Sequence, residues 1–230
     1  SEEGKSIRAV LSYMDAQGFN EGVTTPASSI PFVDDGSASF SISGIAAVGN
    51  TLSISEDSAD PDGAGTLNYS WQISSDGNDW SVVGTNSTYI VGASEEGKSI
   101  RAVLTYMDAQ GFNEVVTTSV SSIPFVDDGS AIFSISGTAA VGNTLSISED
   151  SADPDGTGTL SYIWQISSDE NNWNVAGTNS TYIVGASEEG KSIRAVLSYM
   201  DAQGFNEVVT TSVSSIPFVD DGSAIFSISG

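Results

Sequence analysis

The chain of 230 residues carries 30 acidic side chains against 6 basic ones, for a formal net charge of −24, and 39% of its residues are hydrophobic. Such a chain repels nucleic acid and anionic membrane surfaces, while its apolar content suffices for one or two folded cores. It contains neither cysteine nor histidine, which excludes disulfides, thiolate chemistry, Ser-His and Cys-His nucleophile pairs and the commonest zinc ligand.

No apolar run approaches the roughly 18 residues of a membrane span, so membrane insertion is not expected. No signal peptide or sorting tail is visible in the sequence. We expect any such signal to lie outside this stretch of the chain.

The sequence repeats itself every 93 residues, since Ser-Glu-Glu-Gly-Lys-Ser-Ile-Arg-Ala-Val begins at Ser1, Ser94 and Ser187. The first two copies differ at about 13 positions, and residues 94–137 differ from 187–230 only at Thr105, where Ser198 stands. A unit of this length exceeds a solenoid repeat and matches an immunoglobulin-like sandwich.

The period gives the length of a repeat but not its starting point. With the starting point implied by the family resemblance described below, we predict four segments: residues 1–36 are the C-terminal part of one repeat, 37–129 and 130–222 are complete repeats, and 223–230 form the first strand of another. The last fragment does not supply the strands missing before Ser1. We therefore interpret the chain as a window on a longer array rather than as a unit closed by exchange between its ends.

Within residues 37–129, short segments alternate apolar and polar residues and are separated by turn residues every 8–12 positions. This spacing predicts an all-β sandwich and no helix. The expected strands are 38–43, 51–55, 67–73, 80–83, 87–91, 99–106 and 115–123. Asp76-Gly77 indicates a hairpin turn, and Glu170 replaces the glycine in the second copy, so the turn type there is left open.

Strand 99–106 should place Ile100, Ala102 and Leu104 on one face and Arg101, Val103 and Thr105 on the other, because alternate residues of a strand share one face. Trp71 and Trp164 lie at the centre of their strands and are predicted to be core aromatics. Trp80 and Trp173 are also assigned to packing, with a glycan surface as the alternative.

Several elements resemble the tandem immunoglobulin-like repeats of large bacterial surface adhesins. They are Tyr69-x-Trp71-Gln72, Trp80 followed by Tyr89, Gly97-Lys98-Ser99-Ile100-Arg101 and Tyr106-x-Asp108-x-x-Gly111-x-x-Glu114, each present again 93 residues later. The resemblance covers essentially the whole chain. It implies an extracellular or cell-surface spacer, often stiffened by calcium, and it fixes where each repeat begins. The lack of cysteine also favours a bacterial protein, because small secreted eukaryotic domains often carry disulfides.

Acidic residues gather in three segments of each repeat: the linker, the loop after the second strand and the turn after strand 99–106. In an immunoglobulin-like sandwich these segments meet at one end. Crowded carboxylates need a counterion, and Ca²⁺ takes six to eight oxygen ligands. The predicted calcium ligands are Asp34, Asp35, Asp57, Asp60, Asp62, Asp108 and Glu114, and in the next copy Asp127, Asp128, Asp150, Asp153, Asp155, Asp201 and Glu207.

The loop lacks EF-hand spacing, and solvated turn residues are the alternative interpretation. Glu95-Glu96 and Glu188-Glu189 are expected to be solvated rather than to act as a glycosidase pair, because neighbouring residues at a strand end point apart. Asn86-Ser87-Thr88 and Asn179-Ser180-Thr181 have the form of glycosylation sequons but are assigned to turn chemistry.

The resulting hypothesis is a non-enzymatic spacer or stalk of a bacterial surface adhesin or extracellular fibre, with calcium at the repeat junctions and neighbouring repeats as partners. Two alternatives stay open. One is a repeated glycan- or protein-binding module that presents Phe19, Phe112 and Phe205, and the other is a subunit of a self-assembling filament.

Overall fold

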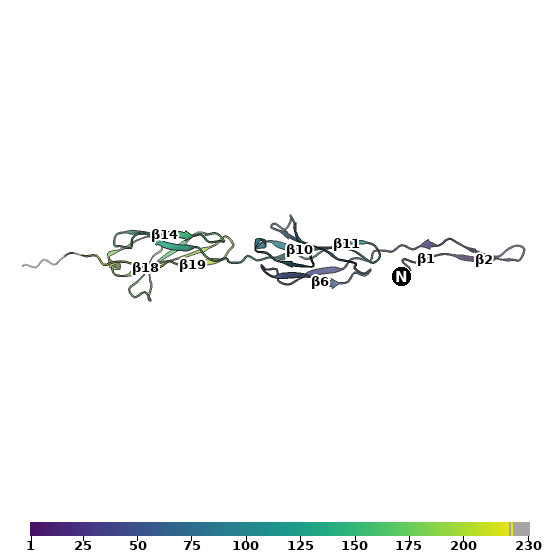
Figure 1. Ribbon diagram of the computed structural model, residues 1–230, viewed down its shortest axis with the longest axis horizontal. Helices are drawn as coiled ribbons and strands as arrows, with labels where there is room; N and C mark the ends of the chain where they lie inside the picture. Colours follow the sequence, from purple (N-terminus) through teal and green to yellow (C-terminus); the bar gives the residue numbers. More distant parts are fainter. Residues whose placement is uncertain (221, 223–230) are drawn as a thin grey trace, which may run out of the picture. The chain divides into compact units, whose positions relative to one another are not determined.

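The computed structural model describes residues 1–220 and 222, and the predicted final strand 223–230 lies outside the described residues. The chain divides into two compact units, Ser1–Val126 and Asp127–Gly230. Figure 1 shows that both are built from strands, with the chain running from purple at the N-terminus to yellow.

The first complete repeat contains eight strands and one 3₁₀ turn. They are β5 (Ser39–Ser43), β6 (Thr51–Ser58), β7 (Asn68–Ser74), β8 (Ser81–Gly84), β9 (Thr88–Ile90), η1 (Ala93–Glu95), β10 (Ser99–Met107), β11 (Asn113–Thr117) and β12 (Ser121–Ser122). One antiparallel sheet has the order β5-β6-β9, and the other has the order β11-β10-β7-β8 with β12 also on β10. Two such antiparallel sheets form an immunoglobulin-like sandwich, as predicted.

The second repeat has the same strands in the same order. They are β13 (Ile132–Ser136), β14 (Thr144–Ser151), β15 (Ser161–Ser167), β16 (Asn174–Gly177), β17 (Thr181–Ile183), η2 (Ala186–Glu188), β18 (Ser192–Met200), β19 (Asn206–Thr210) and β20 (Ser214–Ser215). Its sheets are β13-β14-β17 and β16-β15-β18-β19, with β20 on β18.

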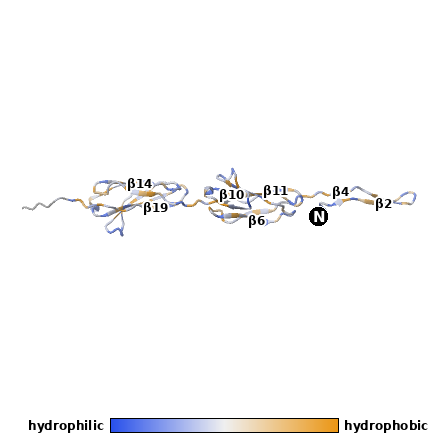
Figure 2. Cartoon of the chain, viewed as in Figure 1, coloured by the Kyte–Doolittle hydropathy of each residue, from blue (hydrophilic) through white to orange (hydrophobic). Residues whose placement is uncertain are grey.

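The core of the first repeat lies between its two sheets. Trp71 of β7 is fully buried, as predicted, and so are Ile100, Ala102 and Leu104 of β10. Trp71 stacks on Tyr89 with ring centroids 5.7 Å apart, and its indole Nε1 donates to Asn86 O at 2.9 Å. The indole thus has a partner for its only polar group while its ring fills the sandwich. Figure 2 shows apolar residues recurring along the strands.

Two strands differ from the predicted elements, and the structure also shows the conformation of the turn at Glu170. Strand β6 continues through Ser58 rather than ending at 55, because a bulge at Asp57 of β6 lets Ser39 pair with Ser58 while Phe40 pairs with Glu56. The last predicted strand, 115–123, is divided into β11 and β12. In the second copy, Glu170 adopts a φ of 57°, so a non-glycine residue takes the left-handed conformation that Gly77 adopts in the first.

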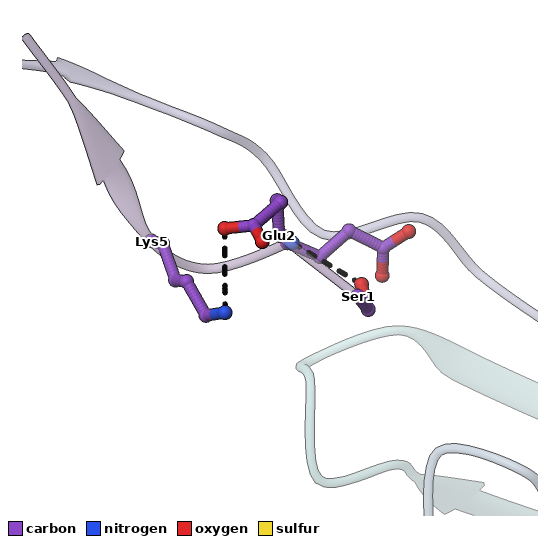
Figure 3. A network of polar contacts seen from close by, with 4 residues as sticks. Ser1, Glu2 and Lys5 are labelled. Atoms are coloured by element: carbon purple, nitrogen blue, oxygen red, sulfur yellow. Dashed lines mark hydrogen bonds and ion pairs between the residues drawn. The ribbon is translucent and has the colours of Figure 1, made fainter.

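The N-terminal segment consists of β1 (Ser6–Ile7), β2 (Val10–Met14), β3 (Asn20–Thr24) and β4 (Ser28–Ser29). β1 pairs with β4 and β2 with β3. Just before β1, Lys5 Nζ lies 3.3 Å from Glu2 Oε2 (Figure 3), the single ion pair among the described residues. The other acidic side chains in the described part of the chain therefore form no ion pair with lysine or arginine.

No helix in the described part of the chain has the length and apolarity needed to cross a membrane.

Candidate metal centre

The loop after β6 holds the first two residues of an acidic cluster. Asp60 is buried, and its Oδ1 accepts a hydrogen bond from the backbone N–H of Asp62 at 2.8 Å. Gly63 closes the turn with a φ of 87°, which suits glycine. At Gly65 a Cβ atom would lie 2.3 Å from the carbonyl oxygen of Met107. This glycine therefore lets the loop approach the end of β10.

Tyr106 of β10 connects this loop to the start of the repeat. Its hydroxyl donates to Asp60 Oδ2 at 2.7 Å and accepts from the backbone N–H of Ala38 at 2.7 Å. Burial, together with the hydrogen bond to Asp60, raises the pKa of Tyr106 to about 12, so the hydroxyl stays protonated at neutral pH. Asp60 is thus held in place by a neutral donor.

The turn between β10 and β11 orients a third carboxylate. Asp108 is only 5% exposed, and its Oδ1 accepts from the backbone N–H groups of Gln110, Gly111 and Phe112 at 2.9, 2.6 and 2.8 Å. Its second oxygen, Oδ2, is buried without a hydrogen-bond partner among the described residues. Burying a carboxylate oxygen without a hydrogen-bond donor costs folding free energy unless a cation binds it.

Asp60, Asp62 and Asp108 each offer one carboxylate oxygen, and these oxygens lie within 4.8 Å of one another. The second repeat gathers Asp153, Asp155 and Asp201 in the same way, and Asp201 Oδ2 is again buried without a partner in the described structure. These carboxylate oxygens, their spacing and the buried oxygen without a hydrogen-bond partner among the described residues fit a hard divalent cation such as Ca²⁺.

Gln110 is a polar neighbour of this cluster that sequence reasoning missed. Its Nε2 donates to Asp62 Oδ1 at 2.6 Å, while its Oε1 is buried and unpartnered among the described residues. Gln203 repeats both features in the second copy. The amide oxygen is a further potential ligand, and the Asp108-x-Gln110 spacing in the turn was the available signal.

The linker reaches the same cluster through its backbone. The N–H of Asp35 donates to Asp62 Oδ2 at 2.9 Å, and the N–H of Asp128 donates to Asp155 Oδ2 at 2.9 Å. These contacts place the linker against the loop as predicted, although the bonds come from the main chain of Asp35 and Asp128 rather than from their carboxylates.

The pKa of Glu114 is affected by the negative charge of the cluster. Desolvation, followed by the negative charges of Asp34, Asp60, Asp108 and Asp62, raises the pKa of Glu114 above its ordinary value. Desolvation and the corresponding carboxylates do the same to the pKa of Glu207. Asp34 and Glu114 thus belong to the electrostatic surroundings of the three clustered aspartates, as do Asp127 and Glu207 in the second copy.

Two of the predicted ligands lie elsewhere. Asp57 is part of β6, where its Oδ1 accepts from the Ser41 hydroxyl at 2.8 Å. Asp150 makes the same bond with Ser134 at 2.9 Å. The extension of β6 and β14 past the expected strand end removes these residues from the loop.

The tryptophans that could form a glycan surface contact arginine side chains of the same repeat. The guanidinium of Arg101 lies 4.0 Å above the centroid of the Trp80 ring, and that of Arg194 lies 4.1 Å above Trp173. One face of each ring is therefore covered. Of the three turn phenylalanines, Phe19 is exposed, while Phe112 and Phe205 are half-buried.

The expectation that Glu95 is solvated is wrong, because this side chain is buried. Its Oε2 accepts from the backbone N–H of Gly92 at 2.8 Å, and its Oε1 accepts from the Tyr89 hydroxyl. The 3₁₀ turn η1 folds the side chain back over Gly92, so Glu95 caps the turn that leads into β10. Burial, with the hydrogen bond to Glu95, raises the pKa of Tyr89.

Together the fold and the site define a chain of tandem immunoglobulin-like sandwiches that carry a repeated acidic cluster. No family model and no curated protein sequence matches the chain. Among solved structures, it is similar to a Ca²⁺-stabilized adhesin of an Antarctic bacterium that binds ice, with 16% identity and a TM-score of 0.35, covering 92% of this chain and 56% of that one.

It is also similar to a 1.5-MDa bacterial ice-binding adhesin, with 14% identity and a TM-score of 0.36 over 95% of this chain and 76% of that one. Domains A168–A170 of titin share 13% identity at a TM-score of 0.29, over 92% of this chain and 75% of that one. The chain thus spans little more than half the length of the first of these structures.

Proposed function

We propose that this chain is a structural, calcium-binding stretch of an extracellular or cell-surface protein, in which each complete repeat holds one Ca²⁺ beside the linker that precedes it. The observation that carries the proposal is the buried Oδ2 of Asp108, which has no partner among the described residues and belongs to a cluster of three carboxylates. The same arrangement recurs at Asp201 in the second repeat.

In this proposal Asp60, Asp62 and Asp108 provide the charged ligands and Gln110 provides an amide oxygen. Water and backbone carbonyls complete the shell, because Ca²⁺ takes six to eight oxygens. The bound cation offsets the negative charges that, together with desolvation as the larger cause, raise the pKa of Glu114. It also fixes the loop that accepts a hydrogen bond from the N–H of Asp35. Calcium therefore stiffens the attachment of the linker to the repeat.

The spacer role is supported by the near-identity of the repeats. Modules that recognise different ligands need different sites, whereas a spacer needs only length and stiffness. The two adhesins of similar fold bind ice, and one of them is retained at a host cell surface; the role proposed for this chain is the stalk of such an adhesin.

Calorimetric titration of CaCl₂ into the metal-free chain tests the proposal. We expect two bound ions per chain and, at a hundredfold excess over Kd, about 2.7 kcal/mol of added stability per repeat. For a domain of this size that corresponds to a rise in melting temperature of about 10–20 °C. If calcium produced no heat of binding and no change in melting temperature, the metal site would be refuted. Small-angle scattering with and without calcium separately tests whether the ion extends the particle.

Asp108→Asn with Asp201→Asn is the informative variant, because asparagine keeps the oxygen that accepts the three backbone N–H groups and replaces only the unpartnered one. We expect it to lose calcium binding and still fold. The matched control, Asp57→Asn with Asp150→Asn, removes the same charge from outside the cluster and should keep both ions. Equal loss in the two variants would mean nonspecific attraction to an acidic surface.

A further inference from the structure

The turn between β8 and β9 contains Asn86-Ser87-Thr88, and the turn between β16 and β17 contains the identical Asn179-Ser180-Thr181. Both triplets have the form Asn-x-Thr, in which the side-chain amide of the asparagine can accept a sugar. Turn chemistry, the assignment expected from the sequence, uses such side chains to bond the local backbone. Within the described residues, however, no side chain of either triplet forms a hydrogen bond. The triplets are therefore not explained by the turns in which they lie.

The main chain fixes each turn instead. The indole Nε1 of the buried Trp71 donates to Asn86 O at 2.9 Å, and that of Trp164 donates to Asn179 O at 2.9 Å. Both asparagines are exposed. The backbone of each turn is thus attached to the core, while the amide nitrogen Nδ2 of each asparagine is accessible to an enzyme.

A third triplet of related form, Asn68-Tyr69-Ser70, provides a contrast. Asn68 begins β7, and its Nδ2 donates to Thr105 O of β10 at 3.4 Å. The adjoining Tyr69 packs against the core of the repeat. Ser161 stands at the equivalent position of the second copy, so this triplet is not repeated. The amide of Asn68 therefore belongs to the sheet, unlike the amides in the two turns.

The two turns also lie where both sheets end. β8 is the last strand of the sheet β11-β10-β7-β8, and β9 is the last strand of the sheet β5-β6-β9. In the second repeat β16 and β17 have the same positions. Each triplet thus connects two edge strands, and edge strands offer unpaired backbone groups to other chains.

These edges lack the charged residues and prolines that protect many edge strands. Residues 80–94 and 173–187 contain no charged residue and no proline, although the chain as a whole is 16% charged. Val82 and Ile90 are 59% and 66% exposed, and Val175 and Ile183 are 64% and 66% exposed. A bulky hydrophilic group on the intervening turn would cover such an edge.

We propose that Asn86 and Asn179 are N-glycosylation sites and that the attached sugars shield the neighbouring sheet edges. The co-substrate is a sugar whose anomeric carbon carries a diphosphate leaving group, linked to either a nucleoside or a lipid. The bond between Nδ2 and the anomeric carbon forms. The bond from that carbon to the diphosphate oxygen breaks, its electron pair leaves with the diphosphate, and Nδ2 loses one proton to a base of the transferase.

Mass spectrometry of peptides from the protein isolated from the cells that naturally make it tests this assignment. We expect sugar on Asn86 and Asn179 and none on Asn68. A single monosaccharide indicates a nucleoside diphosphate donor, whereas a preassembled oligosaccharide indicates a lipid-linked donor. Unmodified amides at both turns, or equal modification of Asn68, would overturn the inference.

Enzymatic transfer to the full chain isolates the role of the triplet. The folded chain is incubated with UDP-glucose and a soluble asparagine glucosyltransferase, and its intact mass is measured. We expect one glucosyl group on each of Asn86 and Asn179. Thr88→Val with Thr181→Val should lose both groups, because the hydroxyl of the triplet is removed, and Thr88→Ser with Thr181→Ser should keep them. Asn68→Gln is the matched control and should also keep them. A parent chain that accepts no glucose would overturn the inference, as would equal transfer to the valine variant.

Sedimentation of the chain with and without the sugars tests the shielding. We expect the unmodified chain to self-associate at high concentration and the glucosylated chain to stay monomeric. Val82→Lys with Val175→Lys places a charge on each edge and should keep the unmodified chain monomeric. If the parent chain sediments as a monomer with and without sugar, the shielding is refuted. Neither triplet contains a clustered aspartate, so the calcium titration succeeds or fails independently of these experiments.

Discussion

Replacing Tyr106 with Phe removes a single oxygen atom that connects the start of the first repeat to the acidic loop. The ring is 3% exposed, and its edge-to-face contact with Phe40, with centroids 6.5 Å apart, should survive. What is lost is the acceptor for the buried N–H of Ala38 and the donor to the buried carboxylate of Asp60. The substitution therefore isolates two hydrogen bonds from the packing around them.

The magnitude follows from these two groups. A buried polar group left unsatisfied costs about 1–3 kcal/mol, and hydrogen bonds to charged groups are worth about 1.5–3 kcal/mol. Allowing for water that reaches Asp60, we expect a loss of about 3 kcal/mol from the first repeat. At about 4–8 °C per kcal/mol for a domain of this size, its melting temperature should fall by about 12–24 °C.

Scanning calorimetry of the full chain measures this loss against an internal reference, because the second repeat keeps Tyr199. We expect the unfolding transition of the first repeat to shift to a lower temperature and that of the second repeat to keep its melting temperature. Tyr199→Phe should displace the other transition by a similar amount, since its hydroxyl makes the equivalent bonds to Ala131 and Asp153 at 2.7 and 2.6 Å. A fall below about 4 °C would refute the reasoning that these hydrogen bonds stabilise the repeat.

Three further predictions address other contacts. Gly97→Ala should lower stability by about 1–2 kcal/mol in urea unfolding, because a Cβ atom would lie 2.2 Å from the Phe125 ring and φ is +69°; an unchanged midpoint would contradict this. Arg101→Lys should cost about 1 kcal/mol in the same assay, since lysine keeps the charge but not the planar contact with Trp80. The pKa of Glu114 is raised in the folded state, so metal-free stability should fall as pH rises through the window between its ordinary and raised values. Calcium affinity should fall as pH drops through that window, because protonation of Glu114 removes a negative charge from the surroundings of the cluster; titrations at several pH values check both directions.

The architecture was predictable because the alternation of apolar and polar residues is strong and occurs twice. The buried face of β10 and the central position of Trp71 follow directly from a two-residue period. Strand ends depend instead on pairing between distant segments. A bulge at Asp57 lets β6 pair as far as Ser58, and no local sequence pattern near Asp57 predicts it.

The acidic site was predictable at the level of segments but not of atoms. Fold topology brings the linker, the loop and the turn together, which is why Asp60, Asp62 and Asp108 could be nominated as a group. Whether a carboxylate faces the cluster depends on hydrogen bonds that sequence spacing does not specify. Asp35, for example, donates its backbone N–H to Asp62. Gln110 could not be predicted as part of the site, because amide side chains are common in turns.

Glu95 is the opposite case, because its polar sequence surroundings predict a solvated side chain and the structure buries it. Its carboxylate accepts from Gly92 and Tyr89, so it closes the corner before β10 while the neighbouring Glu96 is only half-buried. Acidic residues in this chain thus have at least two separate uses. At Asp108 one oxygen is held by the backbone and the other is left without a partner in the described structure, whereas Glu95 has a donor for each oxygen. Only the first arrangement calls for a cation, and for that reason the calcium proposal rests on Asp108 and Asp201 rather than on the net charge of the chain.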